Sequence, residues 1–186
     1  MNPDRVLENV GVFGVGGVGG YFGGKLCHSQ REGKRLKVSL LARGAHLAAI
    51  RENELLLKTE QEGALRCHPF LATDSREDIP ELDLCILCVK GLDLHALLVK
   101  LKDRIREDPI ILPLLNGVDI HSRIRSVVDR GSVFPACVYV GTHIESHGVV
   151  SQKRGGLQNS SRSGSGDSFL LACGIVGGPA SGKYPL

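Results

Sequence analysis

The sequence predicts an α/β protein with a doubly wound, Rossmann-like parallel sheet. Two observations predict this class: apolar strands alternate with helical segments along most of the chain, and a glycine-rich turn joins the first strand to the first helix. Of the 186 residues, 42% are apolar and 23% charged, so a packed domain is expected and wholesale disorder is excluded. A net charge of +3 and only 4% aromatic residues argue against a nucleic-acid partner.

The first elements form one βαβ unit. A short apolar strand at 10–13 is followed by a run of glycines, and the next segment, 21–28, has helical spacing. Three apolar side chains share one face of this helix: Val18, Phe22 and Leu26. A polar turn then precedes a second apolar strand at 37–42.

The following segments continue the alternation. They are a short helix at 45–52, extended segments at 55–57 and 64–71 around a turn at Gly63, a strand at 83–89, a helix at 92–106, a strand at 110–115, a helix at 122–129 and a strand at 133–140. The apolar run at 83–89 is continuous, as expected for a strand that is covered on both faces. We therefore expect one nucleotide-binding domain over 1–155 and an irregular tail, rich in Gly and Ser, over 156–186.

The glycine turn matches the dinucleotide-binding fingerprint G-x-G-x-x-G. The first glycine permits the tight turn, the second leaves room for the pyrophosphate, and the third lets the helix pack closely on the strand. Free backbone N–H groups at the helix start then face the phosphates. The predicted cofactor-binding residues of the turn are Gly14, Val15, Gly16, Gly17, Val18 and Gly19. The alternative is a glycine-rich helix start that merely packs tightly.

The end of the second strand indicates which cofactor is bound. NAD-binding sites place Asp or Glu there, whereas this chain has Arg43. A guanidinium can pair with a 2′-phosphate through two hydrogen bonds, and a carboxylate would repel that phosphate. Arg43 therefore predicts NADP(H). The alternatives are an exposed arginine that caps a loop, or FAD or S-adenosylmethionine, although both of these usually require an acid at this position.

Two further strand ends carry candidate residues, because ligands of open α/β sheets lie beyond the carboxyl ends of the strands. Lys90 follows the strand at 83–89, and Asn116 follows the strand at 110–115. Lys90 can supply positive charge to the cofactor or to an anionic substrate, and Asn116 can offer both a donor and an acceptor. Considered one at a time, Lys90 is interpreted as a solvated residue at a helix start, and Asn116 as part of an ordinary turn. Together, on neighbouring strand ends, they favour a binding site.

The remaining motifs do not indicate a metal or redox centre. Cys85 and Cys88 lie on a strand, where residues i and i+3 point to opposite faces, so we expect core thiols, with redox or metal use as the alternative. His143 and His147 fall in an expected loop. The segment 177–184 resembles a P-loop but has Tyr in place of the Ser or Thr that holds Mg²⁺.

Several motifs occur in the order seen in ketopantoate reductase (2-dehydropantoate 2-reductase): the glycine turn, Leu41-Ala42-Arg43, Cys88-Val89-Lys90, Pro113-Leu114-Leu115-Asn116-Gly117 and Gly141-Thr142-His143. Over residues 8–155 the chain resembles the N-terminal domain of this family. The resemblance implies NADPH-dependent reduction of 2-dehydropantoate to pantoate, a step towards pantothenate and coenzyme A. It also implies that Lys90 and Asn116 contact both cofactor and substrate, and that Ile144 makes a backbone contact to the cofactor.

The family's helical C-terminal domain, which supplies its catalytic lysine, is not recognisable in residues 156–186. No catalytic proton donor is therefore assigned, and we expect weak NADPH binding with little or no turnover. Two alternatives stay open: a non-catalytic NADP(H)-binding protein, and a reductase of another 2-keto acid or imine. No signal segment or membrane-length apolar run is visible, so we expect a cytoplasmic protein that binds a small 2-keto acid and no membrane, with a homodimer among the possible assemblies.

Overall fold

The computed structural model describes residues 7–29, 36–134 and 136–153. Its main sheet has parallel strands in the order β5-β2-β1-β6-β7-β8. These strands are β1 (Asn9–Phe13), β2 (Lys37–Leu41), β5 (Leu71–Thr73), β6 (Leu82–Leu87), β7 (Ile105–Pro113) and β8 (Ser132–Val133). The first strand along the chain lies in the middle, with later strands added outward on both sides, as in dinucleotide-binding sheets. The predicted fold class is therefore confirmed.

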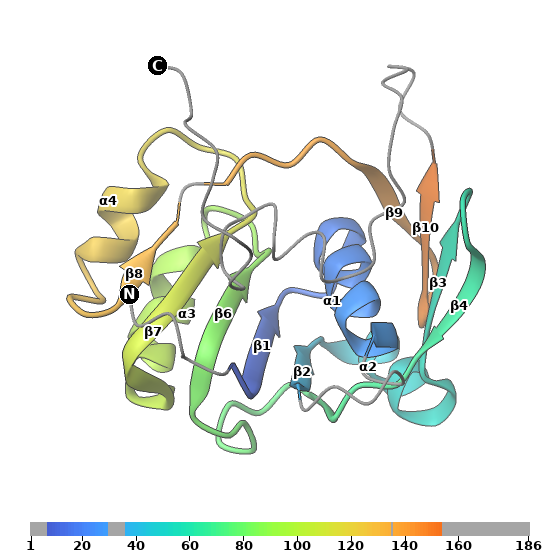
Figure 1. Cartoon of the computed structure of the whole chain (residues 1–186), viewed down its shortest axis with the longest axis horizontal. Helices are drawn as coiled ribbons and strands as arrows, with labels where there is room; N and C mark the ends of the chain where they lie inside the picture. The colour runs from blue at the N-terminus through green and yellow to red at the C-terminus, as the bar shows by residue number, and fades with distance from the viewer. Residues whose placement is uncertain (1–6, 30–35, 135, 154–186) are drawn as a thin grey trace, which may run out of the picture.

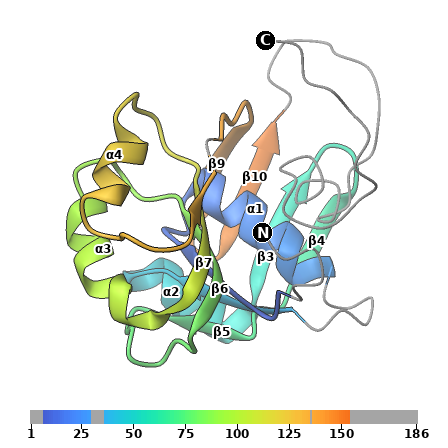
Figure 2. The same ribbon diagram turned by 60° about the vertical axis from the view of Figure 1, so that its left-hand side comes forward.

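Helices cover both faces of this sheet (Figure 1, Figure 2). They are α1 (Gly17–Ser29), α2 (Gly44–Asn53), α3 (Leu94–Leu101) and α4 (Ile120–Arg125). Buried side chains of α1 and α2 belong to one apolar cluster, and those of α3 and α4 belong to another. Successive residues of β1 alternate between the two clusters, with Val12 in the first and Phe13 in the second.

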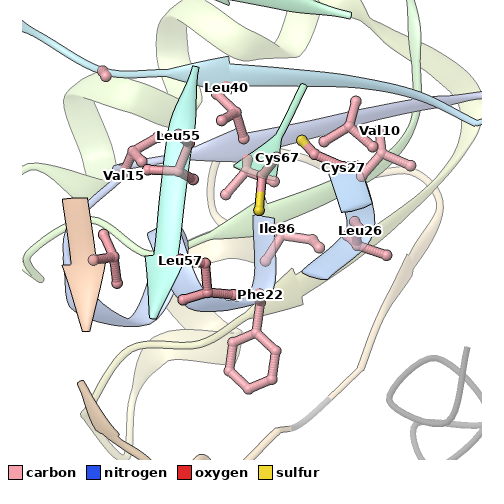
Figure 3. Close-up of a cluster of buried hydrophobic side chains, with 14 of the residues drawn as sticks. Val10, Val15, Phe22, Leu26, Cys27, Leu40, Leu55, Leu57, Cys67 and Ile86 are labelled. Atoms are coloured by element: carbon pink, nitrogen blue, oxygen red, sulfur yellow. The ribbon is translucent and has the colours of Figure 1, made fainter. Parts of the chain in front are cut away.

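A second sheet, which the sequence analysis did not predict, covers the outer side of α1. Its order is β4-β3-β10-β9; β3 and β10 are parallel, and the two outer pairs are antiparallel. Its strands are β3 (Leu55–Thr59), β4 (Gly63–Cys67), β9 (Gly141–Ser146) and β10 (Val149–Lys153). Leu55 and Leu57 of this sheet pack in the same buried cluster as Phe22 of α1 (Figure 3). The segment expected to be extended at 64–71 therefore divides between β4 here and β5 of the main sheet.

Glycines on two sides of α1 let this helix lie between the two sheets. A Cβ atom at Gly23 would lie 2.9 Å from Leu40 Cδ2 of the main sheet. A Cβ atom at Gly20 would lie 2.5 Å from Val150 Cγ2 of the second sheet. Neighbours would have to move to admit either atom, so the close packing of α1 depends on the absence of side chains at these positions.

Most expected elements are confirmed with shifted ends, but the helix expected at 92–106 is too long. It ends at Leu101, a 3₁₀ turn follows as η2 (Lys102–Arg104), and β7 begins at Ile105. Ile105 continues the apolar spacing of the helix, yet it pairs with Leu82 of β6 and is only 3% exposed. Pairing in the sheet outweighs helical periodicity at this residue.

Two expectations near the end of the described chain are wrong. The strand expected at 133–140 is replaced by the short β8, and residues 136–140 belong to no strand. His143, expected in a loop, lies on β9, whereas His147 lies in the turn between β9 and β10, as expected. β9 is an edge strand whose residues are mostly exposed, so its sequence lacks the apolar alternation by which strands are predicted.

The expectation that Cys85 and Cys88 are core thiols on opposite faces of the sheet is confirmed, although Cys88 lies just after β6 rather than in it. Cys85 lies in the cluster with α3, and Cys88 packs against the cluster that contains α1. Burial raises the pKa of the Cys88 thiol to about 12 and also raises the pKa of the Cys85 thiol. Both sulfurs are therefore protonated thiols of the core at neutral pH.

The predicted tail at 156–186, with its P-loop-like segment, lies outside the described residues. The domain boundary at residue 155 therefore stays a prediction. Among the described segments, no helix has the length and apolar character needed to cross a membrane.

Candidate functional site

The glycine turn joins β1 to α1 at the carboxyl edge of the main sheet. Gly14 has a φ of 94°, a conformation that favours glycine. Its N–H donates to the Leu41 carbonyl of β2 at 3.2 Å. A Cβ atom on Gly14 would lie 2.8 Å from the carbonyl oxygen of Cys88, just after β6. The turn therefore lies tightly against the ends of both neighbouring strands.

The other two glycines of the fingerprint have contrasting surroundings. A Cβ atom built on Gly16 meets no atom within 4 Å, so the space beside this residue is open. A Cβ atom on Gly19 would collide with the Gly14 carbonyl oxygen and lie 3.0 Å from the Cβ of Cys88. Gly19 therefore packs against the turn, whereas Gly16 leaves open the approach that a pyrophosphate requires.

The start of α1 provides surroundings suited to an anion. Its first turn contains no acidic residue, and its free N–H groups carry the positive end of the helix dipole. β9 passes close to this helix start, because a Cβ atom on Gly17 would lie 2.5 Å from the Thr142 carbonyl oxygen. Thr142 Oγ1 is buried and has no hydrogen-bond partner among the described residues. The glycine turn, the helix start and β9 together frame one end of the candidate site.

A cavity of about 260 Å³ continues from the glycine turn across the ends of β1 and β2 towards α3. Three cationic side chains line it, Arg43, Arg76 and Lys100, together with the carboxylates Asp74 and Asp93. The Arg43 side chain is 84% exposed and its Nη2 lies 3.9 Å from Asp93 Oδ2. An exposed pair at this separation contributes little to stability, so the Arg43 guanidinium is available to a ligand.

Sequence analysis identified Arg43 but missed Arg76 and Lys100. Arg76 follows β5, so the strand-end rule would have found it if 64–71 had been divided between two sheets. Lys100 lies on α3, where an exposed charge is ordinary, and only the tertiary structure brings it to the cavity.

Lys90 and Asn116 lie on neighbouring loops, after β6 and β7, and both residues are exposed. The loop of Lys90 is held from two sides. The Asp93 N–H donates to the Lys90 carbonyl at 2.9 Å, and the Arg123 guanidinium of α4 donates to the Gly91 carbonyl. The structure therefore brings both predicted substrate-binding residues to one edge of the sheet. Sequence analysis did not single out Arg123, because no local pattern links α4 to this loop.

Ile144 lies on β9 and pairs with Val150 of β10. Thr142, which precedes it on the same strand, is the residue whose carbonyl meets the start of α1. β9 therefore runs beside the site, and the backbone contact between Ile144 and the cofactor stays a prediction.

A second cavity, of about 640 Å³, lies where β6 and β7 begin, at the opposite edge of the sheet. Its carboxylates belong to Glu81, Asp83, Asp103, Glu107 and Asp108. Such a lining repels phosphate groups, and its Arg130 already donates to the carbonyls of Lys102 and Ile105. Within 7–29, 36–134 and 136–153, no three His, Cys, Asp or Glu residues are grouped to hold a metal ion. The carboxyl edge is therefore the candidate site.

Comparisons with known proteins agree with these motifs. A family model described as ketopantoate reductase PanE/ApbA matches residues 10–161. A 2-dehydropantoate 2-reductase of Mesorhizobium japonicum is 31% identical over 107 residues, which are 58% of this chain and 31% of that protein. YkpB of Bacillus subtilis, an uncharacterized oxidoreductase, is 24% identical over 139 residues, which are 75% of this chain and 43% of that protein.

Solved structures share the fold. The crystal structure of 2-dehydropantoate 2-reductase from Porphyromonas gingivalis W83 has a TM-score of 0.74 and 33% identity, and the match covers 80% of this chain and 52% of that chain. A PanE/ApbA family ketopantoate reductase from Ralstonia eutropha has a TM-score of 0.67 and 30% identity, covering 77% of this chain and 46% of that one. The chain thus spans about half the length, or less, of the relatives it matches. Because the family model covers most of the sequence, the protein belongs to the ketopantoate reductase PanE/ApbA family of oxidoreductases.

Proposed function

We propose that this protein binds NADP(H) at the carboxyl edge of its main sheet, with the pyrophosphate on the glycine turn and the 2′-phosphate beside Arg43. The observation that carries this proposal is the open space beside Gly16, next to a helix start without acidic residues. A phosphate that approaches there meets backbone N–H groups rather than side chains.

The charges of the adjoining cavity support NADP(H) over NAD(H). Its three cationic side chains face two carboxylates, and one of these, Asp74, also lies 3.7 Å from the Arg51 guanidinium. A phosphate monoester carries about −1.5 to −2 charge near neutral pH, so it gains far more from these cations than a ribose hydroxyl does.

We further propose that the site serves the reduction of 2-dehydropantoate to pantoate, the reaction for which the M. japonicum and P. gingivalis relatives are named. When bound, the dihydronicotinamide supplies the hydride for the 2-keto carbon. Lys90 is suited to pair with the substrate carboxylate, and Asn116 to hydrogen-bond the ribose and the substrate. A general acid must protonate the resulting alkoxide. We assign no described residue to that step, so cofactor binding is the first property to test.

Parallel titrations with NADPH and NADH test the proposal. We expect tighter binding of NADPH, and we expect Arg43→Ala to weaken NADPH binding by roughly tenfold with little effect on NADH, because a charged hydrogen bond contributes about 1.5–3 kcal/mol. Arg66→Ala, which alters an exposed arginine on β4, is the matched control. Equal affinities of the unaltered protein for the two cofactors would contradict the role of Arg43. Adding 2-dehydropantoate and following NADPH oxidation then separates a reductase from a non-catalytic NADP(H)-binding protein.

A further inference from the structure

His46, in the first turn of α2, is only 8% exposed. Its Nδ1 accepts a hydrogen bond of 3.0 Å from the N–H of Gly148, in the turn between β9 and β10. A ring nitrogen that accepts a hydrogen bond carries no proton, so the neutral ring holds its proton on Nε2. The contact with Gly148 therefore determines the tautomer of His46.

The Nε2 atom of this ring is also buried, yet it has no hydrogen-bond partner among the described residues. Buried donors without an acceptor are rare in native proteins. Burial and, to a lesser extent, the neighbouring His147 lower the pKa of His46, while the backbone carbonyl of Val15 acts in the opposite direction. The ring is therefore neutral near pH 7, and the backbone of Val15 in the glycine turn acts on it electrostatically.

Three parts of the candidate site meet at this ring. α2 begins directly after Arg43, and Val15 lies between the first two glycines of the fingerprint. The β9–β10 hairpin that contains Gly148 also contains Thr142, and the Thr142 carbonyl oxygen lies close to Gly17 at the start of α1. A change at the ring can therefore move the turn, the helix start and the strand beside them.

We propose that His46 is a positioning residue of the cofactor site. Its neutral ring accepts a hydrogen bond from Gly148 and so holds the β9–β10 turn against the start of α2, beside the glycine turn, which keeps that turn in the conformation that accepts a pyrophosphate. The inference rests on the proposed function, because its consequence is a change in dinucleotide affinity. A second proton on the ring converts Nδ1 from an acceptor into a donor, so the bond from Gly148 is lost in acid. Among the described residues, His147 is the titratable group that acts on the ring.

Calorimetric titration with NADP⁺ at about pH 8 and about pH 5, on either side of the ordinary histidine pKa, tests this role. We expect His46→Ala to weaken binding by about tenfold at the higher pH, because the Gly148 N–H loses its acceptor. His46→Asn keeps an oxygen near the position of Nδ1 and does not titrate, so it should lose less affinity between the two pH values than the unaltered protein. His68→Gln, at an exposed histidine paired with Glu54, is the matched control and should keep the full acid loss, including the part due to the 2′-phosphate.

Unchanged affinity in His46→Ala, or an acid loss in His46→Asn equal to that of the control, would overturn the inference. Nitrogen NMR of the unaltered ring gives a readout that does not depend on the folding of any variant. We expect a protonated Nε2 and a bare Nδ1 at about pH 8, and the opposite tautomer would also overturn the inference. If the unaltered protein binds neither NADP⁺ nor NAD⁺, the proposed function fails together with this role. If it binds NADP⁺ and the His46 variants bind equally well, this role alone fails.

Discussion

Gly16 and Gly19 belong to one motif, but a side chain would meet different surroundings at each. The space beside Gly16 is open, and its φ lies outside the positive range that requires glycine. At Gly19, a methyl group would run into the backbone carbonyl of Gly14. At the scale of the residue, Gly16 therefore leaves open the space in which the pyrophosphate is proposed to bind, whereas Gly19 is needed for close packing of the turn.

The same substitution should separate these two roles. Gly16→Ala is expected to leave the free energy of unfolding within about 1 kcal/mol of the unaltered protein, because its conformation suits alanine. Its methyl group would occupy the approach of the pyrophosphate, and we expect NADP⁺ affinity to fall at least about tenfold. Gly19→Ala should lower the free energy of unfolding by about 1–3 kcal/mol, although alanine is the better helix former. Urea denaturation and cofactor titration measure both effects, and normal binding by Gly16→Ala would contradict the role given to Gly16.

At the scale of the element, α1 is unusual because it packs against a sheet on each side. One close approach to the second sheet is at Gly20, where a Cβ atom would lie 2.5 Å from Val150 Cγ2. A helix that is covered on both sides depends on glycine for its spacing, so Gly20 and Val150 should be energetically coupled.

A double-mutant cycle tests this coupling. Gly20→Ala should lower the free energy of unfolding by about 1–3 kcal/mol through overpacking. Val150→Ala alone should lower it by leaving a cavity. The double variant should be more stable than the sum of the two changes by about 0.5–3 kcal/mol, because the smaller side chain makes room for the added methyl group. Simple additivity in urea denaturation would show that α1 and β10 do not pack as closely as the structure indicates.

The elements predicted correctly are those whose signal is local. The strand, glycine turn, helix and strand of the first βαβ unit lie next to one another in the sequence, and the expected order was observed. The second sheet joins β3 to β10, segments far apart in the chain, so no local pattern predicts their pairing. Local patterns fail at Ile105 for the same reason. Its apolar spacing fits a helix, but its pairing partner Leu82 belongs to a strand that lies more than twenty residues earlier in the chain.

At the scale of the whole molecule, the site forms because a parallel sheet brings all its carboxyl strand ends to one edge. This rule predicts that Arg43, Lys90 and Asn116, each of which follows a strand, lie at the same edge of the sheet. His46 could not be predicted in this way, because its partner Gly148 is brought to it by the second sheet. The strand-end rule thus predicts at which edge of the sheet a ligand lies. Residues such as His46, whose contacts join distant segments, can be identified only from the folded structure.

The proposed cofactor binding would depend on the entire fold, because the glycine turn, Arg43 and Lys100 keep their arrangement only in the native protein. A ligand that binds only the native state raises the free energy of unfolding by mass action. At about one hundred times its dissociation constant, NADP⁺ should add about 2.7 kcal/mol and raise Tm by roughly 5–10 °C. NAD⁺ at the same concentration should raise Tm less, because it lacks the phosphate that Arg43 would bind. Gly16→Ala should fold with a similar Tm and show little increase with either cofactor. An equal increase in Gly16→Ala and in the unaltered protein would mean that the dinucleotide binds away from the glycine turn.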